Sequence, residues 1–203
     1  MAESRSPKSG YVKTQTLVFA VFLAFVAGFF SGIVLTILKS HGTPAGVDAG
    51  TAAEMDQARK LQEQIAKLVE LTEQNPQDTE AWTRLGHAYF DSNQPSKAIA
   101  AYNNSLRLQP KNADVWTDLG VMYRRNHQPE EAVRAFDRAI EIDPKHEIAR
   151  FNKGIVLIHD LKQFDAGIRA WKELVDINPM AHAPNGQTVD ELIRQIEAQR
   201  DKS

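Results

Sequence analysis

The chain of 203 residues contains no cysteine. This absence excludes disulfide bonds, thiolate nucleophiles, CxxC redox pairs and most zinc sites. It leaves the redox compartment open, because a chain without cysteine tolerates either compartment. Excess charge is also absent, since the formal net charge is −2, and we therefore expect no dominant surface for nucleic acid.

Catalytic motifs are missing as well. Six histidines are spread along the chain, and none forms an HExxH pair or another ligand pair backed by carboxylates. No GxxxxGKS/T, GxGxxG or GxSxG segment occurs. We therefore predict a protein that is not an enzyme, carries no cofactor or metal, and acts through its surface.

What the chain does contain is a pattern that repeats about every 34 residues. In its first half the recurring residues are Trp82, Leu85, Gly86 and Tyr89, then Trp116, Leu119, Gly120 and Tyr123. In its second half they are Ala98, Tyr102 and Pro110, then Ala132, Phe136 and Pro144, and, 35 residues further on, Gly167, Trp171 and Pro179. Gly154 keeps the interval of 34 from Gly120, so the third copy carries one inserted residue. A fixed period of this length is typical of stacked repeats.

Within each copy the apolar residues follow helical spacing twice, with a short polar turn between the two helices. Gly86 leaves room for the second helix, whose Tyr102 fills the remaining space. Pro95 and Pro129 are expected to begin second helices, because proline is favoured at the first helical position. One helix pair cannot bury its apolar face alone, so neighbouring pairs must stack. We interpret the three tryptophans as core residues rather than as ligand-stacking platforms.

The spacing W-x2-L-G-x2-Y, followed by A-x3-F/Y and P, resembles the tetratricopeptide repeat (TPR). This resemblance implies an all-α helical-hairpin solenoid with repeats at residues 79–112, 113–146 and 147–180. Residues 54–78 are predicted to form an N-terminal capping helix that Asn75–Pro76 closes. Residues 181–203 are predicted to form a loop and a C-terminal capping helix, which a Thr188–Glu191 capping box begins.

Residues 14–38 contain no charged residue and are long enough to cross a hydrocarbon core of about 30 Å. A cleaved signal peptide has a shorter apolar region and a small-x-small cleavage site, whereas Lys39 follows this run directly. We therefore predict an uncleaved signal anchor that makes the protein single-pass. The basic tail at residues 1–13 places the N-terminus in the cytoplasm. The linker at residues 39–53 and the repeats would then lie across the membrane, which for a bacterial inner membrane is the periplasm.

Small residues recur every fourth position along this predicted anchor. They are Ala20, Ala24, Gly28 and Gly32. Such a stripe allows two membrane helices to approach closely. It predicts contact with the transmembrane helix of a partner or a homodimer. The alternative is that the stripe reflects only the high frequency of glycine and alanine in membrane spans.

In TPR proteins the first helices of the repeats line a concave face. The resemblance places Phe90, Val121, Arg124, Arg125, Ile148, Phe151, Ile155, Ile158 and His159 there. Four of these, Ile148, Phe151, Ile155 and Ile158, form an apolar strip, which predicts binding of the nonpolar face of an amphipathic helix from a polypeptide client. The Lys/Asn constellation with which some TPR proteins clamp a C-terminal carboxylate is not evident. The alternative is that the loop at residues 180–187 or the C-terminal helix fills the strip.

An N-terminal anchor before a small repeat domain is similar to the TPR factors of bacterial cytochrome c maturation. Ala81–Trp82, Ala170–Trp171 and the Pro184–Asn185–Gly186 turn add to this resemblance. It implies a domain that binds the C-terminal segment of apocytochrome c and presents it to the haem-ligation machinery. Two alternatives stay open: a TPR accessory of the secretion translocon that holds exported chains, and a mitochondrial outer-membrane receptor that faces the cytosol.

Overall fold

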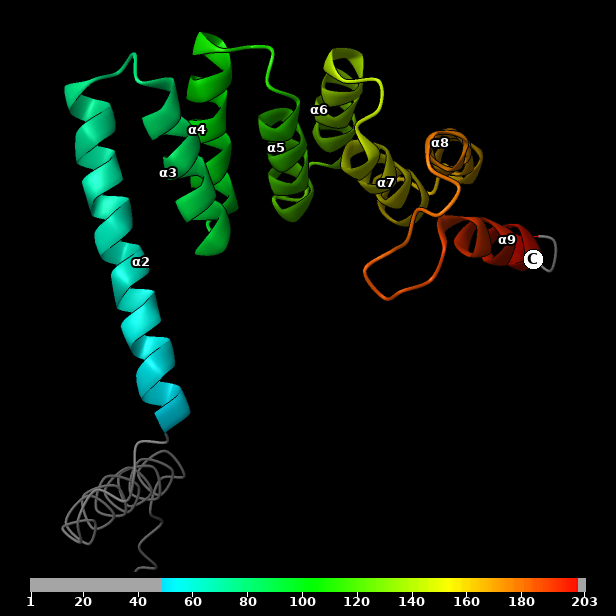
Figure 1. The fold of residues 1–203 in the computed structure, drawn as a ribbon, viewed down its shortest axis with the longest axis horizontal. Coiled ribbons are helices and arrows are strands. Elements are labelled where there is room, and N and C mark those ends of the chain that lie inside the picture. The colour runs from blue at the N-terminus through cyan, green and yellow to red at the C-terminus, as the bar shows by residue number, and fades with distance from the viewer. Residues whose placement is uncertain (1–48, 201–203) are drawn as a thin grey trace, which may run out of the picture. The chain divides into compact units, whose positions relative to one another are not determined.

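A computed structural model describes residues 49–200, which are helical apart from turns, loops and one antiparallel bridge between His182 and Thr188 (Figure 1). The elements in chain order are α2 (Ala49–Gln74), α3 (Thr79–Asp91), α4 (Pro95–Leu108), α5 (Ala113–Arg125), α6 (Pro129–Ile142), α7 (Glu147–Ile155), η1 (Val156–Asp160), α8 (Phe164–Ile177) and α9 (Val189–Arg200). The all-α architecture predicted from the repeats is therefore confirmed for this range.

By its internal contacts the chain divides into two units, Met1–Glu54 and Met55–Ser203. The described part of the first unit is only the beginning of α2. Among the helices at residues 49–200, none combines the length and apolar character that crossing a membrane requires. The predicted anchor at residues 14–38, with Ala20, Ala24, Gly28 and Gly32, lies outside the described residues.

The N-terminal capping helix begins earlier than the sequence analysis placed it. Residues 49–53 are predicted to belong to the linker, but α2 starts at Ala49. Ala52 and Ala53 favour this extension, since alanine has the highest helix propensity. Further along α2, Ile65 and Leu68 pack in one cluster with Leu85 of α3.

Three antiparallel hairpins follow, formed by α3 with α4, α5 with α6, and α7 and η1 with α8. Each hairpin turns at a residue with positive φ, namely Asn93 (52°), His127 (58°) and Lys162 (57°). Helices α4 and α6 begin at Pro95 and Pro129, as the sequence predicts. Helix α8 lacks this proline and begins at Phe164.

The glycines at the centre of the hairpins allow the close approach that the sequence predicts. A Cβ atom at Gly86 would lie 2.4 Å from the Tyr102 ring, and one at Gly154 would lie 2.1 Å from Trp171 Nε1. Side chains at either position would therefore push the two helices of a hairpin apart.

The C-terminal helix α9 covers the end of the stack. Its Val189 and Ile193 share a buried cluster with Ile158 and Trp171. The predicted capping box begins the helix: the Thr188 N–H donates to Glu191 Oε2 at 3.1 Å, and the Glu191 N–H donates to Thr188 Oγ1 at 3.2 Å.

The inserted residue of the third copy is accommodated by η1, a π-helical turn that continues α7. At the end of α5, the Asn126 N–H donates to the carbonyl of Met122, four residues back, at 2.9 Å. At the end of η1, the Leu161 N–H donates to the carbonyl of Val156, five residues back, at 3.0 Å. The wider spacing places the extra residue inside η1. A single π-turn is the usual way for an α-helix to absorb one added residue.

Candidate peptide-binding groove

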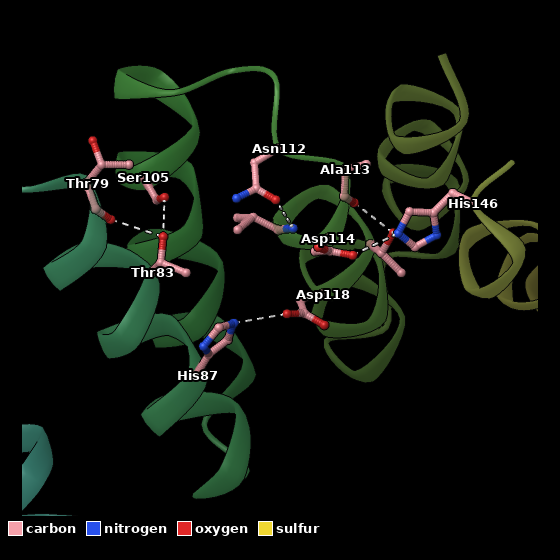
Figure 2. A network of polar contacts seen from close by, with 11 residues as sticks. Thr79, Thr83, His87, Ser105, Asn112, Ala113, Asp114, Asp118 and His146 are labelled. Carbon is pink, nitrogen blue, oxygen red and sulfur yellow. Dashed lines mark hydrogen bonds and ion pairs between the residues drawn. The ribbon is translucent and has the colours of Figure 1, made fainter. Parts of the chain in front are cut away.

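Polar side chains connect the first helix of each repeat to that of the next (Figure 2). His87 of α3 faces Asp118 of α5, with 3.1 Å between Nε2 and Oδ2. The pKa of His87 is raised, chiefly by this hydrogen bond, because the carboxylate stabilises the protonated ring. These contacts define an A-helix face, formed by α3, α5, α7 and η1, whose side chains bridge successive repeats.

His146 makes the corresponding connection between the second and third repeats. Its Nδ1 accepts from the Ala149 N–H at 3.2 Å and caps α7, so the ring proton lies on Nε2. That Nε2 lies 3.1 Å from Asp114 Oδ1 and 3.5 Å from Thr117 Oγ1. Figure 2 shows His146 and Asp114 facing each other across the repeat boundary. One side chain therefore starts a helix and ties it to its neighbour.

The two predicted groove arginines lie on the A-helix face, and both are engaged. Arg124 Nε donates to Asp160 Oδ2 at 2.5 Å. The Arg125 guanidinium lies over the Phe90 ring, 4.3 Å from its centroid. The predicted groove residue Val121 is half-buried and packs against two buried clusters, one that contains Leu119 and one that contains Phe136. The arginines thus connect neighbouring helices while they remain exposed on the A-helix face.

The placement of Ile158 in an open groove was wrong, because this side chain is 1% exposed. The predicted position follows from counting forward from Gly154, which takes no account of where the inserted residue lies. Counted back from the turn residue Lys162, the exposed His159 and Asp160 occupy the places of Arg124 and Arg125. Ile158 is thereby turned toward α8. It joins the buried cluster that Trp171 forms with Val189 and Ile193, which we call the C-terminal cluster.

The other three residues of the predicted apolar strip all lie on α7 but differ in their exposure. Ile155 is half-buried against the C-terminal cluster, so the capping segment occupies this end, as the alternative proposed. Phe151 stacks on Trp171, with ring centroids 5.9 Å apart and planes 12° from parallel. The Trp171 indole N–H also donates to the main-chain oxygen of Phe151 at 3.0 Å. Only Ile148 at the start of α7 is strongly exposed, at 63%.

Ile148 borders an apolar groove of about 520 Å³ between α7 and the loop after α8. Phe151 and Leu174 contribute to its lining from the two helices, and Met180, 67% exposed, borders it from the loop. The remaining lining residues are Glu147, Asn152, Asn178, Ala181, His182, Ala183 and Pro184. The groove can accept an apolar side chain, with hydrogen-bonding groups at its edge.

From the sequence, the loop at residues 180–187 was predicted only as a segment that could fill the strip, and not as one wall of an open groove. Met180 and His182 lie outside the repeat signature, and no spacing rule orients a loop residue. The only signal in the sequence was a large apolar residue, Met180, shortly before the Pro184–Asn185–Gly186 turn. Across residues 49–200, no three His, Asp or Glu side chains gather as metal ligands would.

A family model for the tetratricopeptide repeat matches residues 56–113, 83–147 and 117–182. A comparison with curated proteins finds no match. Among solved structures, the chain is similar to a crystal structure of MamA, with a TM-score of 0.58, 22% identity, and coverage of 66% of this chain and 77% of the other.

Two further similar structures carry TPR domains. The first TPR of Spaghetti (RPAP3), solved bound to the HSP90 peptide SRMEEVD, gives a TM-score of 0.54 and 18% identity, covering 63% of this chain and 95% of the other. The Arabidopsis OM64 TPR domain gives a TM-score of 0.52 and 17% identity, covering 58% of this chain and 93% of the other. At these identities the similarities establish the fold alone.

Proposed function

Because this chain belongs to the tetratricopeptide repeat family, we propose that it is a protein-interaction scaffold that binds an amphipathic helical segment of a polypeptide client. The observation that carries this proposal is the exposed pair Ile148 and Met180, 63% and 67% accessible on the two sides of one apolar groove. Two large apolar side chains that stay exposed beside a groove favour a binding surface over random exposure.

The groove suits apolar side chains on one face of a helix. Phe151 and Leu174 lie within it, and a client residue seated there would be removed from water on several sides. The RPAP3 domain, solved with an HSP90 peptide, supports a peptide as the class of partner. The apolar lining and the lack of an evident carboxylate clamp favour side-chain recognition over capture of a peptide's C-terminus.

We further propose that the client is the C-terminal segment of apocytochrome c, presented to the haem-ligation machinery outside a bacterial inner membrane. The support is the uncharged run at residues 14–38, with basic residues before it, together with the resemblance of residues 54–196 to cytochrome c maturation factors. A partner's membrane helix or a second copy would dock on Ala20, Ala24, Gly28 and Gly32.

The client proposal is tested with two labelled peptides and the purified full-length chain. One carries the C-terminal segment of an apocytochrome c, and the other has the same residues reordered so that the apolar side chains no longer share one face. Fluorescence anisotropy should show binding of the first peptide at least tenfold tighter than of the second. Equal binding, or no binding of either peptide, would overturn the proposal.

The membrane proposal needs a separate experiment. A reporter that is active only outside the cytoplasm, fused after Ser203, is expected to be active in bacteria. A matched cytoplasmic reporter at the same position is expected to be silent. The opposite pattern would reverse the orientation and remove apocytochrome c as the client, while leaving peptide binding in the groove to be judged by the anisotropy titration.

A further inference from the structure

A second, polar pocket lies between α3 and α5, on the A-helix face. It measures about 310 Å³ and is lined by His87, Phe90, Asp91, Tyr102 and Asp118. Tyr102 comes from α4 and is 0% exposed, yet its hydroxyl group has no hydrogen-bond partner in the described part of the chain. Buried hydroxyl groups are nearly always bonded, so this one points to a missing partner.

The Tyr102 ring cannot move away to find that partner elsewhere. It lies directly over Gly86, where an added Cβ would be 2.4 Å from Cδ1 and Cε1. On another side it meets the His87 ring edge to face, with centroids 5.6 Å apart and planes at 65°. The ring is therefore fixed in the lining of the pocket, and its buried hydroxyl group stays unpaired there.

The charges around the pocket favour a partner that donates hydrogen bonds. Asp91 and Asp118 both act on Tyr102, since burial first and then these two carboxylates raise the pKa of its hydroxyl. His87 engages one oxygen of Asp118, and the Arg125 guanidinium lies over the Phe90 ring. The carboxylates of Asp91 and Asp118 thus face the Arg125 guanidinium and the His87 ring, which adds a second positive charge only when it is protonated. The oxygen atoms of Asp91, Asp118 and Tyr102 remain as acceptors.

We propose that this pocket binds the side chain of a lysine in the client, whose ammonium group donates to Asp91, Asp118 and the hydroxyl of Tyr102. A lysine ammonium has three donors and no acceptor, which matches these three oxygen groups. Its methylene stem would lie along Phe90. The inference rests on the proposed function in taking the client to be a polypeptide, and it adds a charge requirement at a place distinct from the apolar groove.

The test uses a single amino acid, so that it does not depend on the identity of the client. The full-length protein, carrying ¹³C-labelled tyrosine and histidine, is titrated with Nα-acetyl-lysine N-methylamide and followed by NMR. The expected result is a saturable shift of the Tyr102 and His87 signals. The norleucine counterpart, which has a similar stem without the ammonium, should leave these signals in place.

Two variants and a control assign the site. Tyr102→Phe removes only the hydroxyl and keeps the ring over Gly86, so folding is retained, and it should weaken lysine binding about fivefold, measured on the His87 signal. Asp91→Asn should weaken it similarly. Glu80→Gln, which removes an exposed carboxylate from the same helix, should bind as the unchanged protein does.

The proposal is overturned if lysine shifts the Tyr102 and His87 signals no more than norleucine does, or if both pocket variants bind lysine with unchanged affinity. Peptide binding to the apolar groove is measured separately by anisotropy. A protein that binds the amphipathic peptide but not lysine would contradict this inference alone. One that binds lysine but not the peptide would contradict the proposed function alone.

Discussion

Ile158 fills the space that a side chain on Gly167 would need. A Cβ atom at position 167 would lie 2.4 Å from Ile158 Cγ1 and 3.0 Å from the main-chain oxygen of Gly154. The π-helical turn η1 brings Ile158 to this place, where it packs between the two helices of the third hairpin. The added residue of the third copy thus contributes to the core instead of extending the binding surface.

Gly167→Ala is therefore expected to lower the free energy of unfolding by about 1–3 kcal/mol, because the new methyl group overpacks the hairpin. Ile158→Ala alone should lower the free energy of unfolding by about 2–5 kcal/mol. The double variant should lose less than the sum of the two, since the smaller side chain at 158 makes room for the methyl group. Urea unfolding of the three variants measures this, and strict additivity would show that the two residues do not share the space.

Arg150 takes the place that tryptophan holds in the first two repeats. Trp82 and Trp116 donate their indole N–H groups to Pro76 and Pro110 carbonyls, at 3.0 and 2.9 Å. Arg150 is 8% exposed, its Nε and Nη1 lack hydrogen-bond partners in the described chain, and the nearest carboxylate oxygen of Glu173 is 3.8 Å from Nε. A buried charge with so few bonds is a destabilising feature.

Arg150→Trp is expected to stabilise the protein by roughly 1 kcal/mol, because it removes unsatisfied donors and restores an indole six residues after Pro144. Thermal unfolding should show a raised melting temperature. Glu173→Gln is the control and should change stability little, since the carboxylate is exposed and distant. If Arg150→Trp and Glu173→Gln both destabilise, the Arg150–Glu173 ion pair contributes more than its geometry suggests.

The His87–Asp118 contact predicts a pH dependence of stability. The pKa of His87 is raised in the folded chain, so its contribution is fully present below the unfolded value of 6.5 and is lost as pH rises through the folded pKa. The gap in melting temperature between the unchanged protein and His87→Gln should therefore be larger at pH 5.5 than at pH 8. When Asp118→Asn is also present, the effect of His87→Gln on the melting temperature should be the same at both pH values. A gap that is independent of pH would show that the ion pair does not form in solution.

The repeated signature was sufficient to predict the hairpins, because glycine, proline and aromatic residues act locally and recur at fixed intervals. Gly86 facing Tyr102 and the helix start at Pro95 follow from such local rules. The orientation of Ile158 did not follow, since an interval of 35 residues shows that an insertion exists between Gly154 and Gly167 without locating it. The apolar groove was predicted only from its helical side, because the loop that carries Met180 has no periodicity.

Phe151 is a poor probe of the groove, although it lies within it. Its ring stacks on Trp171, so Phe151→Ala should lower the free energy of unfolding by about 1 kcal/mol or more and also weaken binding. Differential scanning fluorimetry should show this loss in the absence of any peptide. An unchanged melting temperature would mean that the stacking contributes nothing to the fold. Ile148 separates the two effects, since its exposed side chain supports little of the core.

The most direct test of the central claim is the dissociation constant of the labelled amphipathic peptide for Ile148→Glu in the full-length chain. The account predicts binding about tenfold weaker, with an unchanged melting temperature, because a carboxylate beside the groove cannot remain solvated when an apolar face docks. Met55→Glu, at a similarly exposed residue of α2, should bind as the unchanged protein does. Equal affinity of the Ile148→Glu variant and the unchanged protein would contradict the groove as the binding site.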